Sequence, residues 1–202
     1  MRPTLLPFVL AATVTVLIGF GVWLEPYFAG DVALARALQA VFPEPSWATG
    51  ISRIASAPAK YWVMGIAVGV SYALAGWRAA LVAVGLVLLD QYGSEASKAI
   101  VARPRPSRDL VAVAGTPGGF TFPSGTLTFF CATFGWMAVL AARRPLTVRS
   151  RAVLAVSSVM IVLACAARVV LGAHWPSDVI LTVVICLTWL WATGRVLTRD
   201  QG

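Results

Sequence analysis

The chain has 202 residues, of which 59% are hydrophobic and only 12% charged, and its formal net charge is +8. Because soluble domains contain roughly 25% charged residues, this composition excludes an ordinary soluble protein and predicts an integral membrane protein. The basic residues are scattered among several connections instead of forming one dense run, so the positive charge does not indicate nucleic-acid binding.

Apolar runs divide the chain into predicted membrane-spanning helices, each close to the roughly 20 residues that cross a bilayer. Six such runs lie near 4–24, 60–75, 79–101, 123–142, 152–171 and 176–194. We therefore expect an all-α, polytopic membrane protein, a six-transmembrane-helix bundle that forms one domain over residues 1–202. No small-x-small cleavage pattern follows the first run, so we expect a retained anchor and not a removed signal peptide. Only Gly76–Arg78 separates the second run from the third, which predicts a tight helical hairpin.

The charges of the connections predict the orientation of the helices. If six helices alternate, one side receives basic residues that only Asp200 offsets: Arg2, Arg78, Arg143, Arg144, Arg149, Arg151, Arg195 and Arg199. Once the basic residues of the site described below are set aside, this pattern places both termini in the cytoplasm. The outer side then receives the 25–59 connection, the 102–122 loop and the loop around His174. The 25–59 connection, with Leu34 and Leu38 among polar residues, is predicted to hold an amphipathic helix on the membrane surface.

Three cations lie close together at the end of the third predicted helix. Lys98, Arg103 and Arg105 fall within eight positions, and Pro104 and Pro106 end the helix. Such a cluster forms an electropositive cup, and the planar guanidinium of arginine suits bidentate binding of phosphate. The cluster is also compatible with a basic rim that touches anionic lipid head groups.

The fourth predicted helix opens with the run Phe122-Pro123-Ser124-Gly125-Thr126. Ser124 is a favourable N-cap residue, and the start of a helix exposes backbone N–H groups that attract anions. Gly125 allows a ligand to approach that backbone closely. Taken by itself, the run favours an ordinary capped transmembrane helix over an anion site.

The only histidine of the chain, His174, follows Arg168 by six residues and precedes Asp178 by four. A neutral imidazole can act as a nucleophile when another group fixes its tautomer. Pro176 favours a helix that starts just after His174, which would bring Asp178 within reach of the imidazole N–H. Arg168 would hold an anionic substrate beside it. The alternative is a polar loop residue near a membrane surface.

All three groups lie on one predicted face of the membrane. Cations, helix-start amides and a single imidazole together suit phosphoryl transfer, in which a protein mainly neutralises the equatorial oxygens and aligns an in-line attack. The combination therefore favours an enzymatic role over three unrelated local features.

These residues resemble the motifs of the type 2 phosphatidic acid phosphatase superfamily, which includes membrane lipid phosphatases and vanadium haloperoxidases. Residues Lys98–Pro106 match the first motif, Lys-x6-Arg-Pro, and Pro123–Thr126 correspond to the second, Pro-Ser-Gly-His. Residues Ala167–Asp178 correspond to the third, Ser-Arg-x5-His-x3-Asp. With six predicted helices in the same order as in the lipid phosphatases, the resemblance covers nearly the whole chain.

The resemblance implies a membrane phosphatase that hydrolyses a lipid-linked phosphate or diphosphate without a metal or another cofactor. His174 would attack phosphorus and form a phosphohistidine, Asp178 would orient it, and water would release phosphate. The motifs imply the following substrate-binding residues: Lys98, Arg105, Ser124, Gly125, Thr126 and Arg168. The implied partners are a phosphorylated membrane lipid and the bilayer, in the cytoplasmic (inner) membrane of a bacterium with the site facing the periplasm.

Two positions depart from the family pattern. Ala167 replaces a serine, and Thr126 replaces the histidine that protonates the leaving oxygen in the family. General acid catalysis contributes about 10²–10⁴-fold. A leaving phosphate, with a second pKa of about 6, needs protonation less than an alkoxide does, since even water has a pKa of about 15.7. Thr126 therefore predicts a preference for a lipid diphosphate, such as undecaprenyl diphosphate or another polyprenyl diphosphate, over a monoester such as phosphatidic acid.

Other functions remain compatible with these residues. A lipid phosphotransferase would pass the phosphate to an acceptor, and a non-catalytic protein would bind the lipid phosphate without turnover. A transporter is less well supported, because Asp90 is the main polar residue within the spans and is expected to be hydrogen-bonded inside the bundle. Glu95 is expected to pair with Lys98 or Arg103, or alternatively to serve as a proton donor. The cysteines fall inside predicted spans and are expected to be free thiols: Cys131, Cys165 and Cys186.

Overall fold

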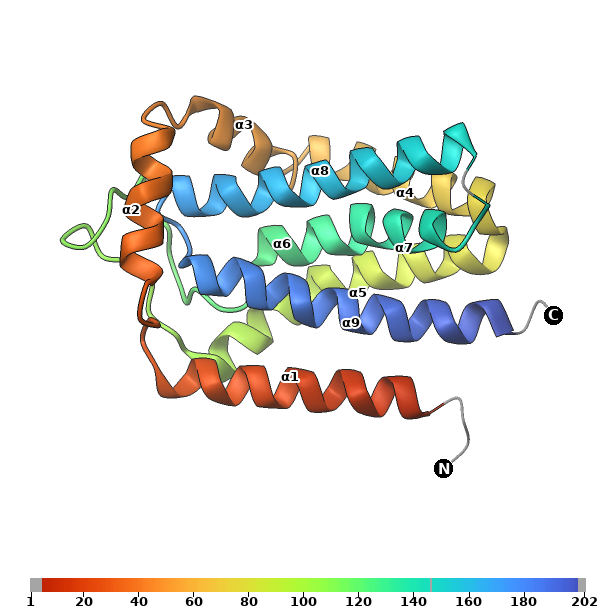
Figure 1. Cartoon of the computed structure of the whole chain (residues 1–202), viewed down its shortest axis with the longest axis horizontal. Coiled ribbons are helices and arrows are strands. Elements are labelled where there is room, and N and C mark those ends of the chain that lie inside the picture. Colours follow the sequence, from red (N-terminus) through yellow and green to blue (C-terminus); the bar gives the residue numbers. More distant parts are fainter. Residues whose placement is uncertain (1–4, 146, 200–202) are drawn as a thin grey trace.

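The computed structural model describes residues 5–145 and 147–199, which form helices joined by connections. In chain order the elements are α1 (Leu6–Leu24), α2 (Asp31–Val41), α3 (Ser46–Arg53), α4 (Ala59–Ala75), α5 (Trp77–Val101), α6 (Gly125–Phe130), the π-helical turn η1 (Cys131–Gly135), α7 (Trp136–Ala142), α8 (Val148–Val170) and α9 (Pro176–Arg199). The longer helices run along the molecule, whereas α2 lies across one end (Figure 1). α1 begins and α9 ends at the opposite end (Figure 1). Arg2 and Asp200, which entered the charge argument, lie outside the described residues.

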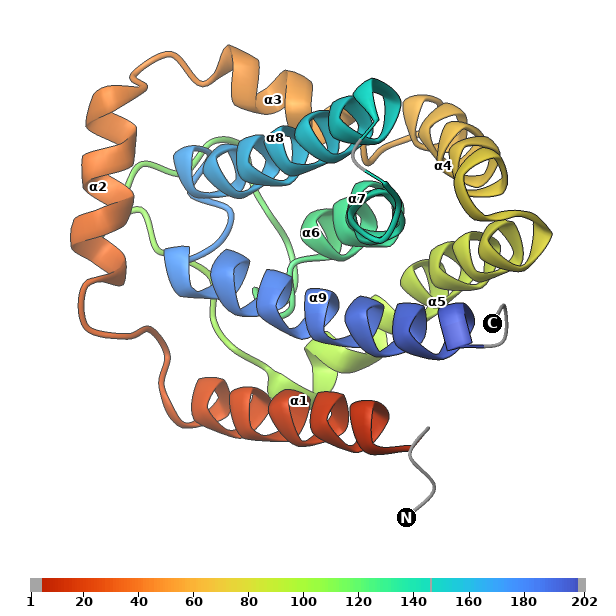
Figure 2. The same cartoon turned by 45° about the vertical axis from the view of Figure 1, so that its right-hand side comes forward.

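The continuous helix formed by α6, η1 and α7 occupies the centre of the bundle, with α4, α5, α8 and α9 around it (Figure 2). In the apolar stretch of this central helix 61% of the residues are buried, whereas the corresponding share is 28% in α8 and in α9. Small residues allow neighbouring helices to approach it, since a Cβ at Gly135 would lie 2.9 Å from Leu190 Cδ1 of α9. Close contacts of this kind stabilise helix packing in lipid, where burial of apolar surface between helices gives little gain. As expected, the cysteines are free thiols: Cys131, Cys165 and Cys186.

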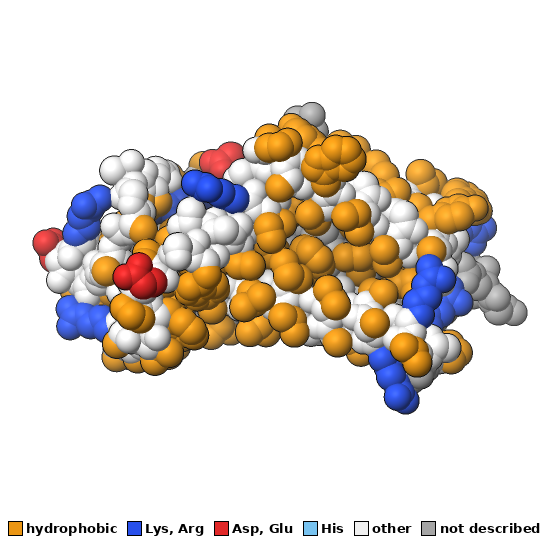
Figure 3. Space-filling model, turned by 90° about the horizontal axis from the view of Figure 1, so that it is seen from above, with side chains coloured by type: hydrophobic (Ala, Val, Ile, Leu, Met, Phe, Trp, Pro, Cys, Tyr) orange, Lys and Arg blue, Asp and Glu red, His pale blue; other side chains and the backbone are white. Residues whose placement is uncertain are grey.

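Several helices are long and apolar enough to cross a membrane. Among the described residues these are Leu6–Leu24, Gly125–Ala142, Val148–Val170 and Pro176–Leu197, with α5 as a further span if its two bent parts count as one. Hydrophobic side chains cover the middle of the molecule, and charged side chains gather toward its two ends (Figure 3). The chain is therefore an all-helical, multi-pass membrane protein. The predicted count of six spans is not confirmed, because α4 is short and α5 is bent.

The helices α4 and α5 form the tight hairpin that the sequence predicts, with only Gly76 between them. The apolar pattern did not predict that α5 bends by 50° between Gln91 and Glu95. Gly93 lies between these two residues, and glycine is among the residues found at helix kinks. The bend separates the apolar part of α5 from its last turns, which carry Lys98.

The 25–59 connection contains two helices, α2 and α3, where the sequence predicted one. The Gln39 side chain fastens α2 to the rest of the protein. Its Nε2 donates to the carbonyl oxygens of Ala112 (2.7 Å) and Val170 (3.2 Å), and its Oε1 accepts from the Ala112 amide at 3.1 Å. α2 thereby holds the loop after α5 against the end of α8, where the chain turns toward His174.

Candidate active site

The residues selected from the sequence come from separate parts of the chain, and the helix ends that carry them lie toward the α2 end of the bundle (Figure 1). They are Lys98 in the last turn of α5, Arg105 in the following loop, Ser124 and Gly125 at the start of α6, Arg168 in the last turn of α8, and His174 and Asp178 at the start of α9. The start of α9 at Pro176 confirms the predicted helix boundary.

His174 lies in the short connection between α8 and α9, and its side chain is buried. The backbone amides of Ala173 and His174 both donate to the Arg168 carbonyl, at 3.1 and 3.3 Å. Gly172 adopts a left-handed backbone with φ +61°, and a Cβ at this position would lie 2.1 Å from the Ala112 oxygen. The loop after α5 therefore packs directly on this turn and fixes the place of His174.

Hydroxyl groups flank both nitrogens of the imidazole. Nδ1 lies 3.1 Å from Thr121 Oγ1, and Nε2 lies 3.3 Å from Ser124 Oγ. On the same side as Ser124, Arg105 Nη1 is 3.5 Å from Nε2 and donates to the Ala173 carbonyl at 2.5 Å. Ser124 occupies the N-cap position of α6 as predicted, but its hydroxyl makes no capping hydrogen bond and faces His174 instead.

Asp178 does not bind the imidazole directly, which corrects the expectation from the sequence. Its Oδ2 lies 4.0 Å from His174 Nδ1 and accepts a hydrogen bond from Thr121 Oγ1 at 2.7 Å. The same oxygen accepts from the Trp175 backbone amide at 2.9 Å. A carboxylate in the first helical turn commonly reaches back to the amide of the residue before the helix. This capping contact draws Asp178 toward Trp175, and the Thr121 hydroxyl fills the remaining space.

Arg103, which the sequence assigned to the cationic cup, is buried among carboxylates. Its guanidinium donates to Asp178 Oδ1 and to Ser177 Oγ, the latter at 3.0 Å, and its Nη2 lies 3.4 Å from Asp31 Oδ2. Asp31, the first residue of α2, also accepts from the Ser177 amide (2.8 Å) and hydroxyl (2.6 Å). The cation therefore joins α2 to the start of α9 and holds Asp178 from the side away from Thr121.

The electrostatic surroundings keep His174 neutral. Burial lowers the pKa of His174 well below its ordinary value of about 6.5, and the positive charges of Arg168 and Arg105 act in the same direction. At neutral pH the imidazole therefore carries one proton and one free lone pair, which is the form that can act as a nucleophile.

A polar cavity of about 480 Å³ lies at the start of α6. Lys98, Gly125, Thr126 and Arg168 line it, so the structure brings these four predicted residues together. His174 is not among the described residues that line this cavity. Its side chain is buried next to the cavity.

Charged side chains dominate the wall of this cavity. Its cations are Arg53, Lys60, Lys98 and Arg168, and its carboxylates are Asp90 and Glu95. Lys98 Nζ lies 2.5 Å from Glu95 Oε1, which confirms one of the two predicted pairings. Arg168 donates from Nη1 to Ser52 Oγ at 3.4 Å, while its buried Nε has no hydrogen-bond partner among the described residues. The cavity therefore presents positive charge that the neighbouring carboxylates only partly offset.

Asp90 is held inside the bundle, as the sequence analysis expected. It accepts a hydrogen bond from the Thr128 hydroxyl of α6, and its Oδ2 lies 3.8 Å from Lys60 Nζ. Lys60 also donates to Gln91 Oε1 at 2.7 Å. The Lys60–Asp90 pair thus spans the side of the polar cavity between α4 and α5.

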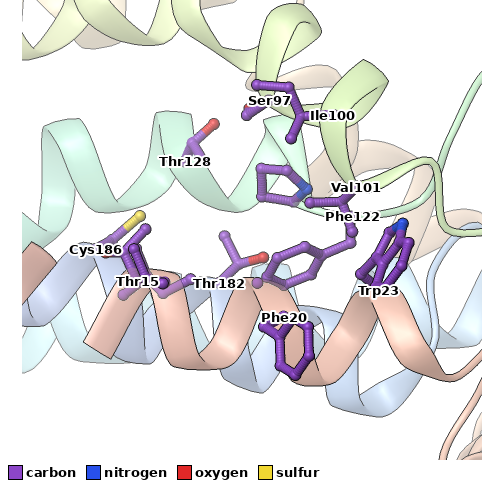
Figure 4. A pocket seen from close by; sticks show the side chains of 14 residues that line it. Thr15, Phe20, Trp23, Ser97, Ile100, Val101, Phe122, Thr128, Thr182 and Cys186 are labelled. Carbon is purple, nitrogen blue, oxygen red and sulfur yellow. The ribbon is translucent and has the colours of Figure 1, made fainter. Parts of the chain in front are cut away.

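An apolar cavity of about 660 Å³ lies between α1, α5 and α9. Phe20 and Trp23 of α1 lie on one side of it, Ile100 and Val101 of α5 on the other, and Phe122 between them (Figure 4). A second apolar cavity of about 320 Å³ shares several of its lining residues: Ser97, Thr128, Ile185 and Cys186. Pro123, which also lines the larger cavity, directly precedes Ser124, whose Oγ lies 3.3 Å from His174 Nε2, so this apolar space begins close to the imidazole.

Sequence reasoning missed the roles of Thr121, Arg103 and Lys60 in this arrangement. Thr121 lies just before the Pro123–Thr126 run, and this position was the only feature of the sequence that could have indicated a role for it. Arg103 was recognised as a cation but not as the partner of Asp31, which lies 72 residues away in the chain. Lys60 stands at the start of an apolar run, as many interfacial lysines do, so nothing in its neighbourhood distinguished it.

A family model described as the PAP2 superfamily matches residues 76–201. The chain belongs to the PAP2 superfamily. A solved structure with a similar fold is a transmembrane PAP2-type phosphatidylglycerolphosphate phosphatase from Bacillus subtilis, with 19% sequence identity and a TM-score of 0.68 over 100% of this chain and 98% of that chain. Curated protein sequences give no match. The region matched to PAP2 contains all the predicted site residues, whereas Asp31, Arg53 and Lys60 precede it.

Proposed function

We propose that this protein hydrolyses a lipid-linked phosphate or diphosphate through attack of His174 on phosphorus. The observation that carries the proposal is the neutral, buried imidazole whose Nε2 faces Ser124 and Arg105. Lys98, Gly125, Thr126 and Arg168 line a positive cavity beside it. A nucleophile and an anion site in this arrangement suit phosphoryl transfer.

In the proposed reaction, Lys98, Arg105 and Arg168 hold the equatorial phosphate oxygens. The Ser124 hydroxyl and the Gly125 amide add hydrogen bonds as negative charge develops. Nε2 forms the N–P bond while the P–O bond to the leaving group breaks, and water then cleaves the phosphohistidine to release phosphate. Arg168 Nε is buried and has no hydrogen-bond partner within residues 5–145 and 147–199, which supports an anion site, because a buried donor requires an acceptor.

Thr126 supports a diphosphate as the preferred substrate. It lines the cavity at the position where the family has the histidine that protonates the leaving group. A leaving phosphate departs with little protonation, and the four cations of the cavity suit more than one phosphate group. The apolar cavity between α1, α5 and α9 supports a long hydrocarbon tail on the substrate (Figure 4).

The proposal includes the location of the reaction. We place the site at the outer, periplasmic face of a bacterial cytoplasmic membrane, with both termini in the cytoplasm and residues 1–202 as one domain. The α2 end of the molecule carries the site. At the other end, Arg143 and Arg144 follow α7, and Arg149 and Arg151 lie at the start of α8, which supports this orientation (Figure 1).

Phosphate release from a panel of lipids tests the proposal. The purified protein in detergent is assayed with polyprenyl diphosphate and phosphatidic acid, beside His174→Ala and the control Arg151→Ala, which alters an exposed residue of α8. We expect wild type and the control to release phosphate, faster from the diphosphate, and His174→Ala to release none. Binding of the lipid by wild type without release of phosphate would favour a non-catalytic lipid-phosphate-binding protein. This function is the main alternative to the proposal, because position 126 holds a threonine where the family has a histidine.

A further inference from the structure

The contact between His174 and Asp178 passes through a third side chain. Thr121 Oγ1 lies 3.1 Å from His174 Nδ1 and 2.7 Å from Asp178 Oδ2, whereas Nδ1 and Oδ2 are 4.0 Å apart. All three side chains are buried, and the Thr121 amide donates to the Arg103 carbonyl at 2.9 Å. The hydroxyl is therefore held between the imidazole and the carboxylate by the backbone of its own loop.

The partners of Asp178 decide the direction of these hydrogen bonds. The carboxylate accepts from the Arg103 guanidinium and from the Trp175 amide. A carboxylate can only accept, so the Thr121 hydroxyl must donate its proton to Oδ2. The lone pairs of Thr121 Oγ1 are then left to accept a proton from His174 Nδ1.

The other nitrogen leads independently to the same tautomer. Arg105 Nη1 lies 3.5 Å from His174 Nε2, and a guanidinium can only donate. This contact favours a lone pair on Nε2, on the side of Arg105 and Ser124. With one proton on a neutral imidazole, that proton is on Nδ1.

We infer that Thr121 is a positioning residue, whose hydroxyl transmits the orientation of Asp178 to His174 and keeps the imidazole proton on Nδ1. Its effect on catalysis rests on the proposed function. When Nε2 bonds to phosphorus, the leaving oxygen takes the electron pair of the breaking P–O bond and the ring becomes positively charged. The proton stays on Nδ1, where the Thr121 oxygen and the negative Asp178 behind it stabilise the charge.

Because His174 is the only histidine, its tautomer can be observed directly. The protein labelled with ¹⁵N-histidine is examined by NMR in detergent at neutral pH, as wild type, Thr121→Ser and Thr121→Val. We expect a protonated Nδ1 and an unprotonated Nε2 in wild type and Thr121→Ser. In Thr121→Val the Nδ1 proton loses the hydroxyl acceptor, so the population should move toward the tautomer protonated at Nε2, which can donate to Ser124 Oγ.

Turnover gives the second readout. Loss of a hydrogen-bond partner in a buried site corresponds to a decrease in rate of about 5- to 150-fold. Thr121→Val should therefore lower kcat by that factor, with a much smaller change in KM. Thr121→Ser should restore most of kcat. Thr133→Val is the matched control, because Thr133 is equally buried and its hydroxyl donates only to carbonyls of its own helix, Phe129 and Phe130.

The two readouts separate this inference from the proposed function. A wild-type imidazole protonated on Nε2, or a tautomer that Thr121→Val leaves unchanged, overturns the inference whether or not the protein releases phosphate. The first of these results needs no variant, so it holds even if Thr121→Val does not fold. If wild type releases no phosphate, the proposed function fails, and the NMR result still decides whether Thr121 positions His174.

Discussion

Arg103 is the residue whose removal should disturb the fold most clearly. In Arg103→Met, a side chain of similar length leaves Asp31 and Asp178 buried without their shared cation, and Ser177 loses a donor. Removing one partner of a buried ion pair costs about 3–5 kcal/mol, a large part of a total stability of about 5–15 kcal/mol. For a chain of this length 1 kcal/mol corresponds to about 2–4 °C in Tm, so the expected loss is about 6–20 °C.

Thermal unfolding in detergent measures this loss, with Arg151→Ala as the matched control. Arg151 is exposed on α8, so its replacement should change stability by no more than about 0.5 kcal/mol. The Tm of Arg103→Lys should fall between those of Arg103→Met and the control, because lysine keeps the charge but lacks the planar guanidinium that reaches both carboxylates. If Arg103→Met unfolds within about 2 °C of the control, the description of Arg103 as the cation that holds α2 to α9 is wrong.

Three further predictions concern the loop, the protonation state and the missing acid. Gly172→Ala should lower stability by more than the roughly 1–2 kcal/mol that a left-handed backbone costs an alanine, because its Cβ would also meet the Ala112 carbonyl. Gly115→Ala is the control in the same unfolding assay, because Gly115 has φ +68° and no atom within 4 Å of an added Cβ, so this variant measures the backbone cost alone. Because burial lowers the folded-state pKa of His174, the proposed nucleophile stays neutral as the pH falls, and the acid limb of kcat/KM should lie below pH 6.5. An acid limb above that value contradicts the burial argument. Thr126→His should raise turnover of a lipid monoester by up to about 10²–10⁴-fold with little effect on a diphosphate, and an equal effect on both substrates would refute the proposed role of position 126.

Much of the site could be predicted because its residues follow short-range rules. Pro176 starts α9, Ser124 takes the N-cap position of α6, and Lys98 lies at the end of α5, all as local helix preferences indicate. The apolar runs likewise located the long helices. These features depend only on neighbours in the chain, which a single sequence displays.

The remaining features depend on contacts between distant segments. Arg103 and Asp31 are separated by 72 residues, and Thr121 and Asp178 by 57 residues. The spacing of residues within a short segment therefore could not predict either contact. The direct hydrogen bond between Asp178 and His174 was a natural expectation from their four-residue separation. The Trp175 amide competes for the same carboxylate, and the Thr121 hydroxyl comes from a loop whose path the sequence does not reveal. The bend of α5 at Gly93 was missed because an apolar pattern carries no information on helix direction.

The central claim is that His174 attacks phosphorus, and trapping the covalent intermediate tests it most directly. The protein is mixed with a polyprenyl diphosphate labelled with ³²P in its terminal phosphate, and the reaction is quenched with alkali during the first turnover. We predict an acid-labile label bound to the protein in wild type and in Arg151→Ala, and none in His174→Ala. Phosphate release by wild type without such a label, or a label that persists in His174→Ala, would contradict the assignment of His174 as the nucleophile.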